Sequence, residues 1–434
     1  MGKNGKELYR LSSSQKELTL GEFPPEKCDL WNMVGFHSYI AENCRLDLLE
    51  KCWNRVVETH DALRLRMVGR IVRRQYIEDY AYETLPVVKV DGWEGFKKLE
   101  KEERAVAVPM FGGALYRITL VDCGNGAGGM IACLHNLCCD GYTLEMIFEQ
   151  LESLYGLALR GEEFPVCKEY SYVDYLKQDE KYVSSGERKK DYKWWKEKYR
   201  ALRHYSIPAG RTTKKVRTNL VVSETSEELY KKMDAFSEEV SSPVTSVIMS
   251  AMALSTYRLT GKTCFCFFNL SHGRRTFALR HTAGCMFLVN PVFFQIDAEK
   301  SFREMVKQDY MNYLEFLQHG RLPWEKHLDL SYFESVKLGF NFHHHWIYFS
   351  PMGLGGLSAE SKLGLEAFDE DVLENPFYCA VYDMPEENLL HIDLNYQMAK
   401  FSAEQMEHAR QTFEDVLAWS LEHPDRKIQD MDIG

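Results

Sequence analysis

The sequence predicts a mixed α/β (α+β) protein of two lobes, and three observations carry this prediction. The chain has 434 residues, more than the roughly 250 to 300 at which one hydrophobic core stops growing. Hydrophobic residues make up 45% and charged residues 27% of it, an ordinary globular balance that excludes a long disordered region. Segments of strand character alternate with amphipathic helices along the whole chain, which is typical of mixed folds.

In the first part of the chain, apolar spacing predicts a helix at 48–57 and strands at 115–121 and 130–134. A second helix is predicted at 143–155, because six apolar side chains fall on one helical face there, with Thr143 as the N-cap. The order at this point is therefore strand, tight turn, helix.

A strongly basic segment follows. Residues 188–217 hold twelve Lys or Arg against Asp191 and Glu197, a charge of +10 in a chain of -11. A solvated linker between the lobes explains such a run. The alternative is a docking patch, including Lys189, Lys190 and Lys193, for an acidic partner or a phosphate.

The second lobe is predicted to contain two helices, three strands and a glycine-rich loop. The helices are expected at 243–259 and 403–421, the strands at 264–270, 287–296 and 338–348, and the loop at 351–356. We place the lobe boundary near residue 180, so that the lobes are 1–180 and 181–434.

Charge and cysteine content exclude several classes of function. A net charge of -11 disfavours nucleic acid as a partner, because neutralising phosphates needs clustered basic residues. The twelve cysteines form no CxxC pair, so we expect reduced thiols and a cytoplasmic protein. The start of the chain has no apolar stretch that could serve as a signal peptide, and the uncharged run 240–257 contains Pro243 and many hydroxyl residues. We therefore expect no membrane anchor.

The motif that points to chemistry is His-Asn-Leu-Cys-Cys-Asp-Gly at residues 135–141, directly after the predicted strand 130–134. It resembles the HHxxxDG signature of nonribosomal peptide synthetase condensation domains, which belong to the chloramphenicol-acetyltransferase-like acyltransferase superfamily. Gly141 permits a sharp turn. A side chain that projects from the end of a strand just before such a turn can reach an incoming nucleophile.

Further segments resemble motifs of the same family and occur in the family's order. They are Ser12-Ser13-Ser14-Gln15 with Leu18 (SxAQxxLW), His60 to Arg64 (RHExLR, with Thr59 in place of Arg), Tyr172 to Tyr175 (YxDY), Trp194-Trp195 (YW), Ser271 to Arg274 (SGR), Leu322 to Glu325 (YPFE), and Gly284 with Asn290 (GxFVN). The last element departs from its pattern, because its Gly and Asn are six residues apart rather than four and Pro291 replaces Thr.

The resemblance implies two chloramphenicol-acetyltransferase-like lobes that meet in a V, with a substrate tunnel between them. It also implies that Asp140 is a structural residue, forming a clamp with Arg274 of the second lobe. The catalytic position of the family is the second histidine of the motif, which is Asn136 here. His135 and Gly141 complete the expected catalytic motif.

Asn136 changes the expected chemistry, because an amide is neither an acid nor a base at neutral pH. It can still orient an amine, and positioning alone can supply roughly 7 to 11 kcal/mol of the barrier reduction. A hydroxyl acceptor would need a base. The substitution therefore favours either an amine acceptor or loss of activity.

Histidines 343–345 lie in the predicted strand 338–348. Strand alternation puts His343 and His345 on one face, but no third ligand is apparent, which disfavours a metal site. They either line the tunnel as hydrogen-bonded polar groups or one of them is a displaced base. Cys138 and Cys139 have no activating neighbour in the sequence, which disfavours covalent catalysis.

By resemblance, two carrier proteins would present phosphopantetheine-bound substrates, and an acceptor amine would attack the donor thioester to form an amide. No bound cofactor or metal is expected. Two alternatives stay open, a non-catalytic member that binds a carrier-tethered chain or a partner enzyme, and a free acyltransferase that uses a coenzyme A thioester. The chain length leaves no room for an adenylation or carrier domain, which fits a stand-alone enzyme or an excised first domain.

Overall fold

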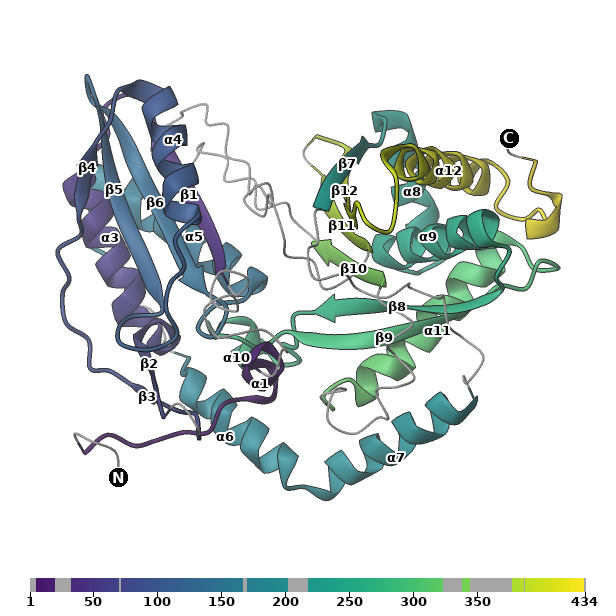
Figure 1. Cartoon of the computed structure of the whole chain (residues 1–434), viewed down its shortest axis with the longest axis horizontal. Helices are drawn as coiled ribbons and strands as arrows, with labels where there is room; N and C mark the ends of the chain where they lie inside the picture. The colour runs from purple at the N-terminus through teal and green to yellow at the C-terminus, as the bar shows by residue number, and fades with distance from the viewer. Residues whose placement is uncertain are drawn as a thin grey trace. The chain divides into compact units, whose positions relative to one another are not determined.

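The computed structural model describes residues 5–19, 33–69, 72–166, 170–201, 218–322, 338–343, 377–385 and 387–432. These residues form two compact units, and each contains a β-sheet with helices packed on it (Figure 1). Unit 1 holds the described residues up to Gly186 together with the segment 272–287, and unit 2 holds the others. The mixed α/β class predicted from the alternation of helical and strand segments is confirmed.

Unit 1 is built on a four-stranded sheet in the order β1-β6-β5-β4, in which only β4 and β5 run parallel. Its strands are β1 (Met33–Ile40), β4 (Val87–Lys89), β5 (Tyr116–Gly124) and β6 (Ala127–His135). Its longer helices are α3 (Leu46–Thr59), α4 (Gly92–Arg104), α5 (Gly141–Leu159) and α6 (Tyr172–Val183). Five shorter elements complete its described part: α1 (Ser13–Thr19), the turn η1 (Asp61–Arg64), the hairpin of β2 (Leu65–Val68) with β3 (Arg74–Ile77), and α10 (Phe277–Arg280).

Strand β6 is buried on both faces. Ala132 and Leu134 pack in the core that includes α3 and α5, whereas Ile131 and Cys133 pack with Phe96 of α4. Helices therefore cover both sides of the sheet, which explains why the sequence of this strand is continuously apolar instead of alternating.

Unit 2 is built on a six-stranded mixed sheet in the order β7-β12-β11-β10-β8-β9, in which β10 runs parallel to both of its neighbours. The strands are β7 (Thr218–Glu224), β8 (Cys264–Ser271), β9 (Leu288–Gln295), β10 (Leu338–His343), β11 (Phe377–Met384) and β12 (Leu389–Gln397). The helices are α7 (Gly186–Ala201), α8 (Glu227–Glu239), α9 (Val244–Thr260), α11 (Phe302–His319) and α12 (Ala403–Glu422).

The predicted elements correspond closely to observed ones. The helices expected at 48–57, 243–259 and 403–421 are α3, α9 and α12, and the strands expected at 264–270 and 287–296 are β8 and β9. The strand expected at 338–348 is described over 338–343 as β10. The loop expected at 351–356 lies outside the described residues.

Helix α5 begins two residues earlier than predicted, and its N-cap is Asp140, not Thr143. The Asp140 side chain accepts a hydrogen bond from the Thr143 backbone N–H. A carboxylate is a strong N-cap and also interacts favourably with the helix dipole. The prediction failed because an acidic residue three positions upstream competes for the same role.

The first half of the basic segment is helix α7, which packs on α11. Trp195 donates an indole hydrogen bond to the carbonyl of His319 (2.9 Å), and the His319 ring lies 2.8 Å from the buried carboxylate of Asp191. Lys198 pairs with Glu315 at 2.8 Å. Residues 186–201 therefore form a helix that is attached to unit 2 on one side, and residues 202–217 lie outside the described part of the chain.

A histidine bridges two carboxylates in the sheet of unit 2. His391 lies 2.9 Å from Glu224 through Nδ1 and 2.9 Å from Asp393 through Nε2. Burial acts to lower the pKa of His391, but the hydrogen bonds and charges of Asp393 and Glu224 outweigh it and raise the pKa above its ordinary value. The protonated form is therefore favoured in the folded state.

This bridge predicts a pH dependence of stability. Because the folded-state pKa is raised, the stabilisation is fully present below the unfolded pKa of about 6.5 and is lost as pH rises through the folded value. We expect His391→Gln to cost more at pH 5.5 than at pH 8.5, measured by urea unfolding at both pH values. A cost that is equal at the two pH values would contradict the prediction.

Candidate functional site

The motif identified in the sequence lies at the end of the central strand of unit 1. His135 is the last residue of β6, and its backbone N–H donates to the carbonyl of Leu115 at 2.8 Å. Residues 136–138 turn, and α5 begins at Gly141. The predicted order of strand, tight turn and helix is confirmed, and a rigid strand and a rigid helix hold the two ends of the turn.

His135 is completely buried. Its Nδ1 accepts a hydrogen bond from the backbone N–H of Leu137 at 3.1 Å, and its carbonyl accepts one from Cys138 at 3.0 Å. A nitrogen that accepts from an N–H carries no proton, so the neutral ring bears its proton on Nε2. His135 is thus built into the turn as one of its hydrogen-bonding groups.

Asn136 differs from its neighbours in exposure. Its side chain is partly exposed, whereas His135, Leu137 and Cys138 are buried. Among the described residues, none forms a hydrogen bond with the Asn136 amide. The turn therefore holds the backbone of this residue while it leaves the amide able to meet another molecule.

Asp140 and Arg274 form the buried ion pair that the resemblance led us to expect. The guanidinium nitrogens Nη1 and Nη2 donate to the carboxylate, at 2.9 and 3.0 Å, and both side chains are almost fully buried. Asp140 also accepts from the backbone N–H groups of Thr143 and Met286, each at 2.9 Å. Burial on its own would raise the pKa of Asp140, but Arg274 and these hydrogen bonds together hold it below its ordinary value.

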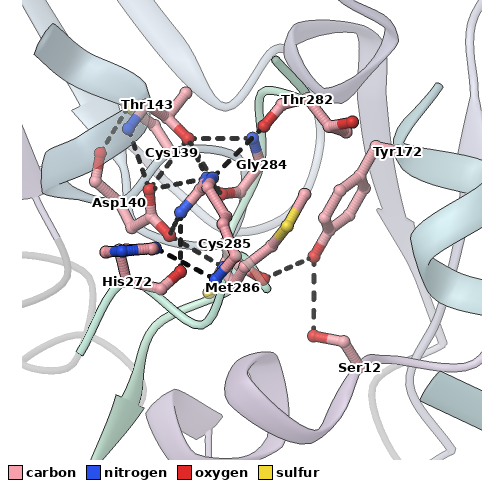
Figure 2. Close-up of polar contacts among 11 residues, drawn as sticks. Ser12, Cys139, Asp140, Thr143, Tyr172, His272, Thr282, Gly284, Cys285 and Met286 are labelled. Carbon is pink, nitrogen blue, oxygen red and sulfur yellow. Dashed lines mark hydrogen bonds and ion pairs between the residues drawn. The ribbon is translucent and has the colours of Figure 1, made fainter. Parts of the chain in front are cut away.

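Arg274 has further partners beside Asp140, and Figure 2 labels three of them, Thr143, His272 and Gly284. It donates to the Thr143 hydroxyl at 2.7 Å, the Gly284 carbonyl at 2.8 Å and the His272 carbonyl at 2.9 Å. All of its close polar contacts are thus intramolecular, and its guanidinium also lies 4.6 Å from the ring of Tyr142. The guanidinium charge is balanced by Asp140 and its N–H groups are bonded to neighbouring oxygens, so we assign the pair a structural role.

The location of this clamp corrects the sequence-based expectation. Arg274 was expected in a second lobe, but the segment 272–287 belongs to the same compact unit as the motif. The chain leaves β8 and packs Ala283 and Met286 into the core of unit 1 before β9 begins. The physical reason is that these apolar side chains are buried there together with the arginine, so the clamp lies within unit 1.

The backbone conformation and the close packing at position 284 both require glycine. Its φ is +138°, a region that favours glycine, and an added Cβ would overlap the ring of Tyr172. Tyr172 in turn donates a hydrogen bond to the carbonyl of Cys285 at 2.8 Å (Figure 2). Asp61 accepts bonds from the backbone of Tyr172 at 2.8 Å and from the Ser171 hydroxyl at 2.5 Å. Segments that resemble three separate family motifs thus meet in unit 1.

Two predicted site residues, His343 and His345, do not belong to the described part of unit 1. His343 ends β10 in unit 2, where the backbone register pairs it with Tyr382. His345 lies outside the described residues. Their roles as tunnel lining or as a displaced base stay predictions.

The cysteines of the motif are poor nucleophiles. Cys138 and Cys139 are fully buried, and desolvation raises the pKa of Cys138 to about 12 and that of Cys139 well above its ordinary value. A thiol needs a lowered pKa to be reactive at neutral pH. In the described part of the chain, no group of three or more His, Cys, Asp or Glu side chains could hold a metal ion.

Lysines 189, 190 and 193 lie on α7 and are exposed. Lys193 is 3.9 Å from Glu197, a solvent-exposed pair of little energetic weight. The opposite side of the helix, with Asp191 and Trp195, packs on α11. The helix therefore presents basic side chains to solvent. Within the described residues, no helix is both long and apolar enough to cross a membrane.

Two glutamines that support the motif turn were not predicted from the sequence. Gln15 of α1 donates a hydrogen bond to the carbonyl of Leu137 at 2.8 Å and exchanges bonds with Gln75 of β3. Gln15 occurs in one of the motif-like segments, but Gln75 has no signal in the sequence. Only the fold brings these residues to the turn.

Comparison with known proteins gives a consistent result. A family model described as "Condensation domain" matches residues 6–434. Surfactin synthase subunit 1 of Bacillus subtilis (strain 168) is 21% identical over 451 residues, covering 98% of this chain and 12% of that protein. The bassianolide nonribosomal cyclodepsipeptide synthetase of Beauveria bassiana (strain ARSEF 2860) is 21% identical over 431 residues, covering 92% of this chain and 13% of that protein. The chain thus spans about an eighth of the length of these relatives.

Solved structures show the same fold. The first condensation domain of the calcium-dependent antibiotic synthetase, in complex with substrate analogue 3a, matches with a TM-score of 0.80 at 15% identity, covering 99% of both chains. A mutant starter condensation domain of rhizomide synthetase, in complex with C8-CoA and Leu-SNAC, matches with a TM-score of 0.77 at 18% identity, covering 98% of this chain and 97% of that one. At these identities the likeness concerns the fold alone.

Proposed function

Because the chain belongs to the condensation-domain family, we propose that it forms an amide bond between an acyl or aminoacyl thioester on a carrier protein and an acceptor amine. The single observation that carries this proposal is the turn at 135–141, where a partly exposed Asn136 sits between a buried strand end and a clamped helix start. Both substrates would meet at this turn.

The chemistry that we propose needs no imidazole at position 136. The lone pair of the free amine attacks the thioester carbonyl, the C–N bond forms and the C–S bond breaks. The proton lost by the nitrogen ends on the departing thiolate, which leaves as a thiol. Asn136 would accept a hydrogen bond from the amine through Oδ1 and so hold it against the carbonyl, which is catalysis by positioning.

Carrier proteins are the partners that fit this reaction. Their phosphopantetheine arms would supply the thioesters, and we propose no cofactor bound to this chain itself. A coenzyme A thioester is the alternative donor, and the rhizomide synthetase domain solved with C8-CoA and Leu-SNAC supplies a suitable pair of probes. A cytoplasmic location stays a prediction from the cysteine content.

Incubating the full chain with C8-CoA or a C8-loaded carrier and with Leu-SNAC tests the proposal. Mass spectrometry should detect the acylated amine and the released thiol, with faster turnover from the carrier. Faster turnover from coenzyme A would favour the free acyltransferase. If the chain binds loaded carriers and forms no amide with several donors and amines, the non-catalytic alternative replaces the proposed function.

We propose the exposed basic side of α7 as the docking site for an acidic carrier. Replacing Lys189, Lys190 and Lys193 together by Glu should slow association by about tenfold or more at low salt, because like charges then oppose the encounter. The measurement is the association rate by stopped-flow fluorescence as a function of ionic strength. Charge reversal at Lys231 and Lys232 of α8, which are also exposed, is the matched control. An unchanged rate would remove the docking role.

A further inference from the structure

Two fully buried glutamines connect the N-terminal segment and the β2–β3 hairpin to the motif turn. Gln15 and Gln75 exchange two amide hydrogen bonds of 2.8 Å each, and both side chains are 0% exposed. Each also holds one backbone group of the N-terminal segment. Gln15 Oε1 accepts from the N–H of Ser12 at 2.9 Å, and Gln75 Nε2 donates to the carbonyl of Arg10 at 2.9 Å.

Gln15 also makes one hydrogen bond outside this pair, to the motif turn. Gln15 Nε2 donates to the carbonyl of Leu137 at 2.8 Å, while the N–H of the same Leu137 donates to His135 Nδ1 at 3.1 Å. Both polar backbone groups of Leu137 are therefore held, one by Gln15 and one by the histidine ring. Asn136 lies between His135 and Leu137, so the orientation of its backbone is fixed from both sides.

We propose that Gln15 is a positioning residue for the motif. Through the Leu137 carbonyl it holds the turn so that the Asn136 amide stays oriented and His135 keeps its proton on Nε2. The effect on Asn136 rests on the proposed function, whereas the effect on the His135 ring does not. Gln75 completes the buried polar group and has no bond of its own to the turn.

The two glutamines provide a matched pair of variants. Gln15→Met and Gln75→Met replace the amide by a side chain of similar shape, and each loses the two bonds within the pair and one bond to the N-terminal segment. Only Gln15→Met also loses the bond to Leu137. The two variants should therefore unfold at similar urea concentrations, and any further difference between them reports on the turn.

Two readouts on the full chain decide the proposal. The first is the tautomer of His135 by NMR of the chain with ¹⁵N-labelled histidine, in which the His135→Gln variant identifies the resonances. Wild type and Gln75→Met should show the Nε2-protonated ring, and Gln15→Met should lose that signature. The second is turnover of C8-CoA with Leu-SNAC, where Gln15→Met should lower kcat roughly 10- to 100-fold with little change in KM, and Gln75→Met less than about threefold.

An equal effect of the two variants on the His135 tautomer, or no effect of either, would overturn the proposal. If wild type forms no amide, the proposed function fails, yet the tautomer readout still decides whether Gln15 positions the turn. Should the methionine variants fail to fold, Gln15→Glu and Gln75→Glu replace them. Glutamate at position 15 cannot donate to Leu137, whereas glutamate at position 75 still accepts from Gln15.

Discussion

Replacing Asp140 by alanine is expected to lower the free energy of unfolding by about 3 to 5 kcal/mol, because the Arg274 guanidinium then stays buried without its counter-charge. Replacing Arg274 by alanine should cost a similar amount, since Asp140 is then the unpaired buried charge. The double variant should cost less than the sum of the two single changes. Urea unfolding of the four proteins measures the coupling.

The exposed pair Arg160 and Glu162, with side chains that are 58% and 51% exposed, is the control for this cycle. Exposed ion pairs contribute little because water and salt screen them, so the same substitutions there should leave the urea midpoint nearly unchanged. If the losses at Asp140 and Arg274 were simply additive, the two charges would not be stabilising each other.

Changing Asn136 to histidine is expected to raise the rate of amide formation by about 10² to 10⁴, the contribution that a positioned general base can make. The same change should add an inflection in the pH–rate profile near the ordinary histidine pKa of about 6.5. Wild type should lack this inflection and become faster with pH only as more free amine is present. Steady-state kinetics from pH 5.5 to 9 tests both expectations.

Asn136→Ala is the matched control, and it should lower the rate only modestly. Replacing His343 or His345 by Gln tests the alternative that one of these histidines is a displaced base. If one of these is a displaced base, wild type already has the inflection, and the Gln variant loses both the inflection and turnover. A wild type and an Asn136→His protein that are equally active would show that position 136 does not take part in proton transfer.

The sequence predicts elements well where the signal is local. The apolar run of β6 and the helical spacing of α5 and α9 identified these elements to within about four residues at either end, because the apolar pattern of each lies within one short stretch of sequence. The cap of α5 was misassigned to Thr143, since Asp140 and Thr143 are both good caps. Choosing between them needs the position of Arg274, which is 134 residues away from Asp140.

The candidate site was predictable only in part, for the same reason. The motif at 135–141 is contiguous, so its residues could be named from the sequence. The turn is held by Gln15, whose amide partner Gln75 is 60 residues away in the sequence, and no spacing rule joins these residues. The assignment of Arg274 to a second lobe failed because a lobe boundary drawn along the chain assumes that the chain crosses between the compact units only once.

The return of residues 272–287 to unit 1 has a consequence for the order of folding. During synthesis, residues up to Gly186 leave the ribosome well before Arg274 and Met286 are made. Until then the core of unit 1 is incomplete and the Asp140 carboxylate lacks its counter-charge. Completing the core of unit 1 requires residues 272–287 to return to it, which closes a long loop in the chain. Unit 1 should therefore reach its native state only after much of unit 2 has been synthesised, and a fragment that ends at Gly186 should not fold independently.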